Sequence, residues 1–253
     1  MKRSAPLLSA AAALLLLGAD AARAQVPDLQ PRAVVELFTS QGCSSCPPAD
    51  ALFVDLAKQR DIITLTLPVT YWDYLGWKDT LGKDSFAKRQ KYYAKARGDG
   101  QVYTPQAVIN GAAHVVGSDR GEIERASKDP PGGGFVAKLA VKEADGQLVV
   151  TLVPVGDVQE RTAGVWVATT TKMVTVPIAR GENQGKTVAY ANVVRGMTRI
   201  GDWDGRPATV TAPLGVTQGP EVDSYVVLIQ AERQGKSGVM PSTVLAAARG
   251  VDR

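Results

Sequence analysis

The sequence contains two cysteines, Cys43 and Cys46, which form a Cys-x-x-Cys pair. A disulfide between them would close a very short loop, and the loop-closure model gives such a disulfide little stabilising value. A purely structural cross-link is therefore a poor explanation of the pair. The spacing favours reversible thiol–disulfide exchange, in which one thiolate attacks a disulfide and the neighbouring thiol releases the product.

The surroundings of the pair predict which cysteine reacts first. The apolar segment 33–38 predicts a short buried strand, and the segment 47–59 opens with two prolines, which are typical of the first turn of a helix. Unpaired amides and the dipole at a helix N-terminus stabilise negative charge, so we expect a lowered pKa for the Cys43 thiol. Cys43 is then the nucleophile and Cys46 the resolving cysteine.

A metal site is the alternative use of two cysteines. Structural zinc requires four ligands, whereas the chain offers this pair and a single histidine, His114. A copper site with Cys43, Cys46 and His114 stays open as the metal-carrying alternative. We expect no metal and no cofactor other than the redox-active disulfide itself.

Hydrophobic patterns predict the elements that position the pair. Besides the strand and helix above, we expect strands at 62–67, 105–109 and 113–116 and helices at 85–96 and 121–127. Asn110-Gly111 favours a tight hairpin turn between the last two strands. The order is β-α-β-α-β-β-α, which indicates an α/β domain with a mixed sheet over residues 25–131.

The second half of the chain has a different sequence pattern. The Pro/Gly-rich segment 129–134 predicts a domain boundary. Strand-like segments follow at 136–141, 148–154, 165–170, 173–176, 187–194, 208–211 and 225–230. Their spacing predicts an all-β, sandwich-like domain over 132–253, with a short helix at 242–249 covering an edge.

The first residues predict export. Lys2 and Arg3 precede an apolar run, 7–17, and small residues stand at Ala22 and Ala24. This layout is typical of a signal peptide, 1–24, cleaved near Ala24, and places the mature protein in the periplasm or outside the cell. The apolar run is too short to span a bilayer, so we expect no membrane span in the mature chain.

The charge balance argues against one class of partner. Removal of the leader, with its three basic residues and one acidic residue, lowers the formal net charge from +4 to +2. This excess is too small to indicate nucleic acid.

Three segments carry a resemblance to known proteins: 35–50 around the cysteines, the aromatic block 71–77, and Tyr103-Thr104-Pro105-Gln106. They resemble the thioredoxin superfamily and, more closely, the secreted thioredoxin-like family catalogued as domain of unknown function 1223. The resemblance implies a thioredoxin-like domain, a cis Pro105 that faces the sulfurs as a third catalytic residue, and a Thr104 backbone that pairs with an extended substrate.

The resemblance also marks a departure. Thioredoxin carries a buried aspartate on the strand before its cysteines, which assists proton transfer, and Leu37 occupies that position here. Glu36 is a proton-transfer candidate if the strand is shifted by one residue, although such a shift reverses the face to which a side chain points.

The aromatic block predicts a substrate groove. Trp72, Tyr74 and Trp77 follow the second strand, on the side of the sheet where the Cys43 loop is expected, and together with Gly42 they are candidate substrate-binding residues. The alternative is that these aromatic side chains pack an inserted helix against the sheet.

These observations lead to two hypotheses. The first is an exported thiol–disulfide oxidoreductase that acts on protein or small-molecule thiols and disulfides and exchanges electrons with an unknown redox partner protein. The second is a periplasmic binding or scaffolding protein, or a metal carrier, with a non-catalytic thioredoxin fold.

Overall fold

The computed structural model describes residues 30–130, 133–156, 158, 162–235 and 238–251. The predicted signal peptide, 1–24, lies outside the described residues, as do residues 131 and 132 of the predicted boundary.

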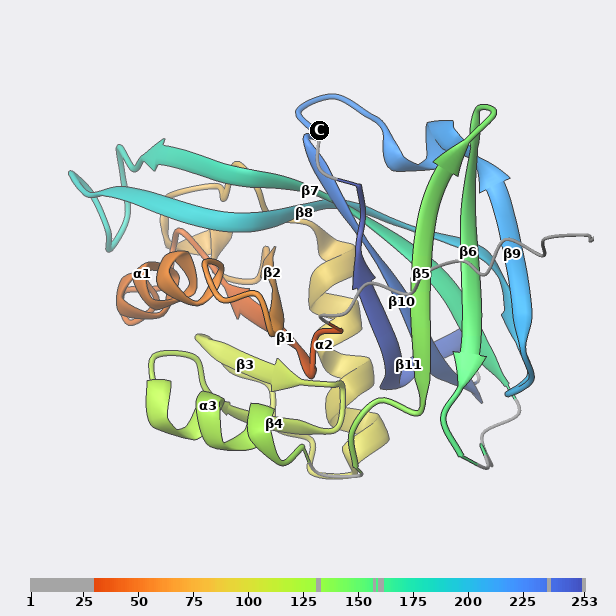
Figure 1. Cartoon of the computed structure of the whole chain (residues 1–253). Coiled ribbons are helices and arrows are strands. Elements are labelled where there is room, and N and C mark those ends of the chain that lie inside the picture. Colours follow the sequence, from red (N-terminus) through yellow and green to blue (C-terminus); the bar gives the residue numbers. More distant parts are fainter. Residues whose placement is uncertain (1–29, 131–132, 157, 159–161, 236–237, 252–253) are drawn as a thin grey trace, which may run out of the picture.

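The first half of the chain alternates strands and helices (Figure 1). Its elements are β1 (Ala33–Thr39), α1 (Pro47–Leu56), β2 (Ile62–Pro68), the 3-10 turn η1 (Asp73–Leu75), α2 (Asp84–Arg97), β3 (Gln106–Ile109), β4 (Ala113–Val116) and α3 (Arg120–Lys128). All residues of β1 and β2 are buried, and α1 and α2 cover opposite faces of β1.

The second half consists of strands. They are β5 (Ala137–Ala144), β6 (Gln147–Pro154), β7 (Ala163–Pro177), β8 (Thr187–Trp203), β9 (Ala208–Pro213), β10 (Ser224–Gly235) and β11 (Gly238–Arg249), with the 3-10 turn η2 (Leu214–Thr217) after β9. β7 and β8 form one long hairpin, whose tip reaches beyond the rest of the sheet on the side of α1 (Figure 1).

Two sheets organise these strands. The larger is an eight-stranded mixed sheet in the order β11-β10-β7-β8-β2-β1-β3-β4, and the smaller has the order β5-β6-β9. β1 is parallel to β2 and antiparallel to β3, and β2 meets β8 in parallel register at Thr66 and Val193. An apolar core between the small sheet and β7, β10 and β11 contains Leu152, Val167 and Ile229.

The expected fold class, an α/β thioredoxin-like domain followed by an all-β sandwich-like domain, is wrong. The described part of the chain is mostly β, with three α-helices, and one large sheet takes strands from both halves. The physical reason lies at β2, which is buried on both faces and keeps a free hydrogen-bonding edge that β8 covers. Hydrophobic patterns report burial and do not report which strand pairs with which.

The expected helix at 242–249 is also wrong, because these residues belong to β11. An alanine-rich segment favours helix locally. Here it pairs with β10 along its length and buries Val244, Ala246 and Ala247, so tertiary packing overrides the local preference.

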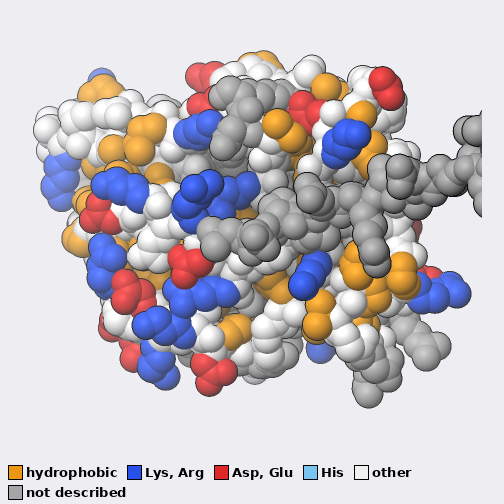
Figure 2. Space-filling view, in the orientation of Figure 1, with side chains coloured by type: hydrophobic (Ala, Val, Ile, Leu, Met, Phe, Trp, Pro, Cys, Tyr) orange, Lys and Arg blue, Asp and Glu red, His pale blue; other side chains and the backbone are white. Residues whose placement is uncertain are grey.

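The surface carries both signs of charge. Figure 2 shows Lys and Arg side chains interspersed with Asp and Glu on the face that it displays. No helix in the described part of the chain has the length and apolar character needed to cross a membrane.

Candidate active site

A disulfide joins Cys43 and Cys46, which confirms that the two cysteines pair. The chain leaves β1 at Thr39 and turns so that the Cys43 N–H donates to the Ser40 carbonyl at 3.1 Å. Cys46 caps α1, and Pro47 is the first helical residue. The disulfide therefore lies at the N-terminus of a helix, as the sequence predicts.

The two sulfurs lie just beneath the surface. Cys43 is 2% exposed and Cys46 0%, whereas Ser44 and Ser45 between them are exposed. The Ser45 hydroxyl oxygen lies 3.4 Å from Cys43 Sγ. Of the two sulfur-bearing residues, Cys43 is therefore the nearer to solvent.

Pro105 lies at the same end of the sheet as the disulfide loop. The Thr104–Pro105 peptide bond is cis, in agreement with the sequence-based expectation. Gln106, which opens β3, is paired with Phe38 of β1, so Pro105 stands level with the exit of β1 into the loop. Within the described residues, the Thr104 N–H and C=O make no main-chain hydrogen bond, which leaves them available to an incoming extended chain.

Four of the predicted substrate-binding residues, Gly42, Trp72, Tyr74 and Thr104, gather at this loop. Trp72 Nε1 donates to Thr104 Oγ1 at 2.7 Å. A side chain at Gly42 would bring its Cβ within 3.1 Å of Trp72 Cβ, so the absence of a side chain lets the loop lie against the indole-bearing residue. Tyr74 stacks on Trp72 with ring centroids 6.4 Å apart and is 77% exposed. Trp72 and Tyr74 thus present an aromatic surface next to the loop.

Trp77 has a different place. Its Nε1 donates to Gln41 Oε1 at 2.7 Å, and its Cβ lies under Gly181 at the tip of the β7–β8 hairpin. Trp77 therefore supports the disulfide loop from the hairpin side and is not part of the exposed aromatic surface.

Glu36 lies away from the disulfide. On β1 it shares the α2 face with Val34 and Phe38, whereas its neighbour Leu37 packs with α1. Its carboxylate accepts two hydrogen bonds from the Arg89 guanidinium, at 2.6 and 2.9 Å. Tyr93 donates a third at 2.6 Å. This buried network links β1 to α2.

Asp50 is a functional candidate that the sequence reasoning missed. It lies one helical turn after Cys46, and its N–H donates to the Cys46 carbonyl at 3.1 Å. Thr39 Oγ1 donates to Asp50 Oδ1 at 2.7 Å, while Oδ2 is buried without a hydrogen-bond partner. Burial raises the pKa of Asp50 well above its ordinary value, and the nearby Asp79 carboxylate adds to the rise. The i, i+4 spacing from Cys46 was the available signal.

Asn183, at the hairpin tip, is a second residue without a sequence-based role. It is 1% exposed, and its Nδ2 donates to the main-chain carbonyls of Gln41 at 2.9 Å and Cys43 at 2.8 Å. Lys186 Nζ donates to its Oδ1. Only the folded chain brings Asn183 to the disulfide loop, 140 residues away in sequence.

The structure does not bring His114 to the cysteines. His114 Nδ1 lies 2.9 Å from the Tyr103 hydroxyl, and its Nε2 lies 3.3 Å from Asp99. Within the described residues, no group of three or more His, Cys, Asp or Glu side chains is arranged to hold a metal ion.

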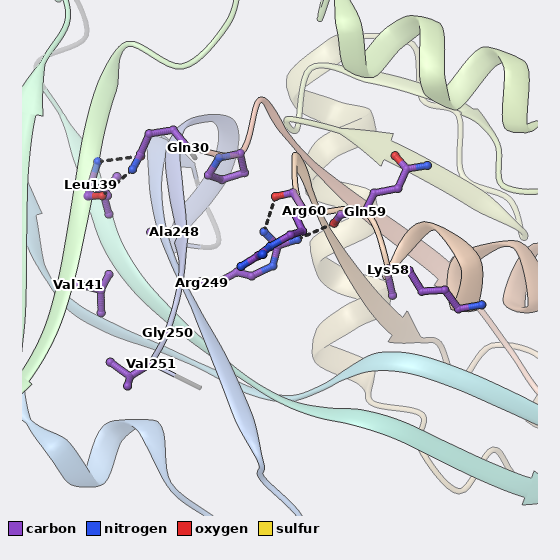
Figure 3. A pocket seen from close by; sticks show the side chains of 12 residues that line it. Gln30, Lys58, Gln59, Arg60, Leu139, Val141, Ala248, Arg249, Gly250 and Val251 are labelled. Atoms are coloured by element: carbon purple, nitrogen blue, oxygen red, sulfur yellow. Dashed lines mark hydrogen bonds between the residues drawn. The ribbon is translucent and has the colours of Figure 1, made fainter. Parts of the chain in front are cut away.

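A separate cavity of about 550 Å³ lies between the C-terminal end of α1, β5 and the end of β11 (Figure 3). It contains none of the predicted site residues. The Arg249 guanidinium donates to the main-chain carbonyls of Gln59 and Arg60 at its wall, so that wall joins the helical half of the chain to β11.

Fold and site together define a β-rich protein with a mixed central sheet and a Cys-x-x-Cys disulfide at a helix N-terminus, beside a cis proline. The chain belongs to the family described as protein of unknown function (DUF1223), which matches residues 34–230. This match confirms the expected membership of domain of unknown function 1223 and does not extend to the thioredoxin superfamily or to secretion.

Two solved structures are similar to this chain. The crystal structure of protein AGR_C_4864 from Agrobacterium tumefaciens is 33% identical, with a TM-score of 0.72, over 88% of this chain and 96% of that one. HBP35 of Porphyromonas gingivalis is 11% identical, with a TM-score of 0.55, over 88% of this chain and 76% of that one, and shows likeness of fold alone. No curated protein matches the sequence.

Proposed function

We propose that this protein is a thiol–disulfide oxidoreductase that acts outside the cytoplasm on protein or small-molecule disulfides. The observation that carries the proposal is the Cys43–Cys46 disulfide at the start of α1, level with the cis Pro105. The resemblance of these residues to the sites of the thioredoxin superfamily supports it. The predicted signal peptide supports export, which cell fractionation of the full-length chain tests.

The reaction has two exchange steps. In the reduced protein, the Cys43 thiolate attacks a substrate disulfide, forms a mixed disulfide and releases the first substrate thiolate. Cys46 then loses its proton, attacks the Cys43 sulfur and releases the second substrate thiolate. The substrate gains two electrons and the cysteine pair loses two, so a redox partner protein must reduce the pair again. The reverse sequence oxidises a dithiol.

The start of α1 stabilises the Cys43 thiolate in a particular way. Pro47 and Pro48 have no N–H, and the N–H groups of Ala49 and Asp50 bond to the Cys46 carbonyl. Since these amides are missing or already bonded, the helix dipole and the Ser45 hydroxyl are the groups that stabilise negative charge on Cys43. The hydroxyl oxygen lies 3.4 Å from Cys43 Sγ and supplies a hydrogen-bond donor for a thiolate. Ser45 is therefore a positioning residue for the nucleophile.

Asp50 is suited to accept the proton of Cys46 in the second step. Its carboxyl lies on the same side of the helix one turn away, and one of its oxygens has no partner within the described residues. Because burial raises the pKa of Asp50, its carboxylate is a stronger base than that of an exposed aspartate.

Two cysteine variants test the proposal. Cys46→Ser should accumulate mixed disulfides with a disulfide substrate, because the second step is blocked, and Cys43→Ser should show neither turnover nor mixed disulfides. Mass spectrometry of the trapped species and the rate of substrate reduction are the readouts. Equal and negligible exchange by the wild type and both variants would refute the proposal. Equilibration with glutathione gives the reduction potential and hence the direction of the reaction.

A binding or scaffolding protein with a structural disulfide is the second candidate, and the burial of both sulfurs favours it. Alkylation separates the two functions. In the reduced protein, a Cys43 that reacts with iodoacetamide at pH 6 much faster than a free cysteine supports the oxidoreductase. A rate equal to or below that of free cysteine supports the binding protein.

A further inference from the structure

A groove begins next to the disulfide. It has a volume of about 480 Å³ and lies between α1 and the N-terminal end of β8. Its lining consists of Pro47, Ala51 and Val54 from α1 and residues 186–189 at the start of β8. The three α1 residues are spaced i, i+4 and i+7, so they form one stripe along the helix.

Residues that line the groove adjoin the proposed redox site on both walls. On the α1 side, its first residue, Pro47, directly follows Cys46. On the hairpin side, Asn183 bonds to the Cys43 carbonyl, and Lys186 at the rim of the groove bonds to Asn183. A chain whose cysteine reached Cys43 could therefore continue directly into the groove.

The β8 wall has the character of a strand edge. Residues 187–191 of β8 pair with β7 on one side. On the other side, β2 meets β8 at Val193 and the Thr66 hydroxyl donates to the Ala191 carbonyl, and in the described part of the chain no strand pairs with 187–190. An unpaired edge suits an extended peptide, which adds main-chain hydrogen bonds there and places alternate side chains in the neighbouring groove.

Size and lining indicate what the groove accepts. From Pro47 to Val54 a helix rises about 10 Å, a length that about three residues of extended chain cover. The side chains are small or apolar except at Lys186 and Thr187. Such a lining gains free energy from apolar side chains and gains little from a small polar disulfide.

We infer that this groove binds the extended, apolar residues that flank a cysteine in a polypeptide substrate, so that the substrate class is protein disulfides rather than small-molecule disulfides. The inference rests on the proposed function and makes the groove its specificity site.

The experiment measures how fast the reduced wild-type protein reacts with each of three disulfide substrates. The first is an eight-residue peptide whose central cysteine is linked to thionitrobenzoate and flanked by Val and Leu. The second has Ser and Gly flanks, and the third is Ellman's reagent. Release of thionitrobenzoate gives kcat/KM for each. The kcat/KM of the wild type should be about tenfold higher for the apolar-flanked peptide than for the polar-flanked one, a ratio that corresponds to a free-energy difference of roughly 1.4 kcal/mol.

A groove variant and a matched control complete the test. Ala51 is exposed, so Ala51→Glu places a charged side chain in the groove without disturbing the core. It should lower the ratio of kcat/KM for the apolar-flanked peptide to kcat/KM for Ellman's reagent by about tenfold. Ser85→Glu adds the same charge to an exposed position of α2, on the opposite face of β1, and should leave this ratio unchanged.

The outcomes distinguish the inference from the proposed function. An unchanged ratio in Ala51→Glu, or a wild type without preference for apolar flanks, overturns the groove as a substrate site while disulfide exchange stands. A wild type that reduces none of the three disulfides refutes the proposed function, and the inference falls with it.

Discussion

Asn183→Ala should loosen the disulfide loop, because this one side chain holds two of its main-chain carbonyls. Both hydrogen bonds are shorter than 3 Å and the amide is buried. In the variant the Cys43 carbonyl keeps the Cys46 N–H at 3.1 Å, whereas the buried Gln41 residue loses the partner of its carbonyl. A buried unsatisfied polar group costs about 1–3 kcal/mol, and the second lost hydrogen bond adds about 1 kcal/mol. We expect the free energy of unfolding to fall by about 2–4 kcal/mol.

Urea denaturation of the oxidised protein measures this loss. Gln184→Ala is the matched control, because Gln184 is the exposed neighbour of Asn183 at the hairpin tip and its substitution leaves both loop hydrogen bonds and the Lys186–Asn183 contact in place. Its effect should stay within about 0.5 kcal/mol, as for surface substitutions in general. Asn183→Asp should destabilise at least as much as alanine at neutral pH, because it faces two carbonyl oxygens with a carboxylate that has no N–H to donate.

A second readout concerns the disulfide itself. Once the loop is released from the hairpin, a small reductant should reach the sulfurs more often, so dithiothreitol should reduce the Cys43–Cys46 disulfide faster in Asn183→Ala than in wild type or Gln184→Ala. The reasoning would be refuted by an alanine variant that matches the control in both stability and reduction rate. In that case the hairpin tip would contact the loop without restraining it.

Three further predictions concern groups around the site. Glu36→Gln should lower the free energy of unfolding by about 3–5 kcal/mol, because it leaves the buried Arg89 guanidinium without its counter-charge; a loss below 1 kcal/mol in urea denaturation would contradict this. Burial raises the pKa of Asp50 in the folded protein, so the folded state holds the Asp50 proton more tightly than the unfolded state does. The stabilisation that this proton gives is complete below the unfolded-state pKa and is lost as pH rises through the folded-state pKa. Asp50→Asn should therefore raise the free energy of unfolding at the upper end of that pH window. It should also remove the slope that Asp50 gives to the free energy of unfolding against pH, which is at most about 1.4 kcal/mol per pH unit. Urea denaturation from pH 4 to 8 measures this slope, and an unchanged slope would show that Asp50 does not titrate in that range. Ser45→Ala should move the pH midpoint of Cys43 alkylation upward by up to about one unit in the reduced protein, because a thiolate loses a donor; an unmoved midpoint would exclude the hydroxyl from this role.

Much of the local structure follows from short-range rules. The apolar run at 33–38 corresponds to β1, the prolines after Cys46 open α1, and Asn110-Gly111 adopts positive φ in the turn between β3 and β4. Asp119 accepts a hydrogen bond from the Glu122 N–H at the start of α3, which is the capping contact that the spacing predicts. In each case the determining residues lie within a few positions of one another.

The architecture required long-range information. The pairing of β8 with β2 joins residues 66 and 193, and it merges into one sheet two segments that local composition separates. The 242–249 segment shows the same effect at smaller scale, since pairing with β10 outweighs its local helical preference. Strand pairing depends on which edges remain free after the rest of the chain has packed, and no local pattern encodes that.

The same distinction between local and long-range information applies to the candidate site. The sequence by itself determined the reacting atoms and their immediate setting: two cysteines three residues apart, a strand before them, a helix after them, and a proline that opens a later strand. Only the tertiary structure decided what surrounds the sulfurs. It turned Glu36 toward Arg89, placed Asp50 behind Cys46, and brought Asn183 from the far half of the chain onto the loop. Covalent spacing sets local geometry, whereas contacts between distant segments arise only when the whole chain buries its apolar surface and satisfies its main-chain hydrogen bonds.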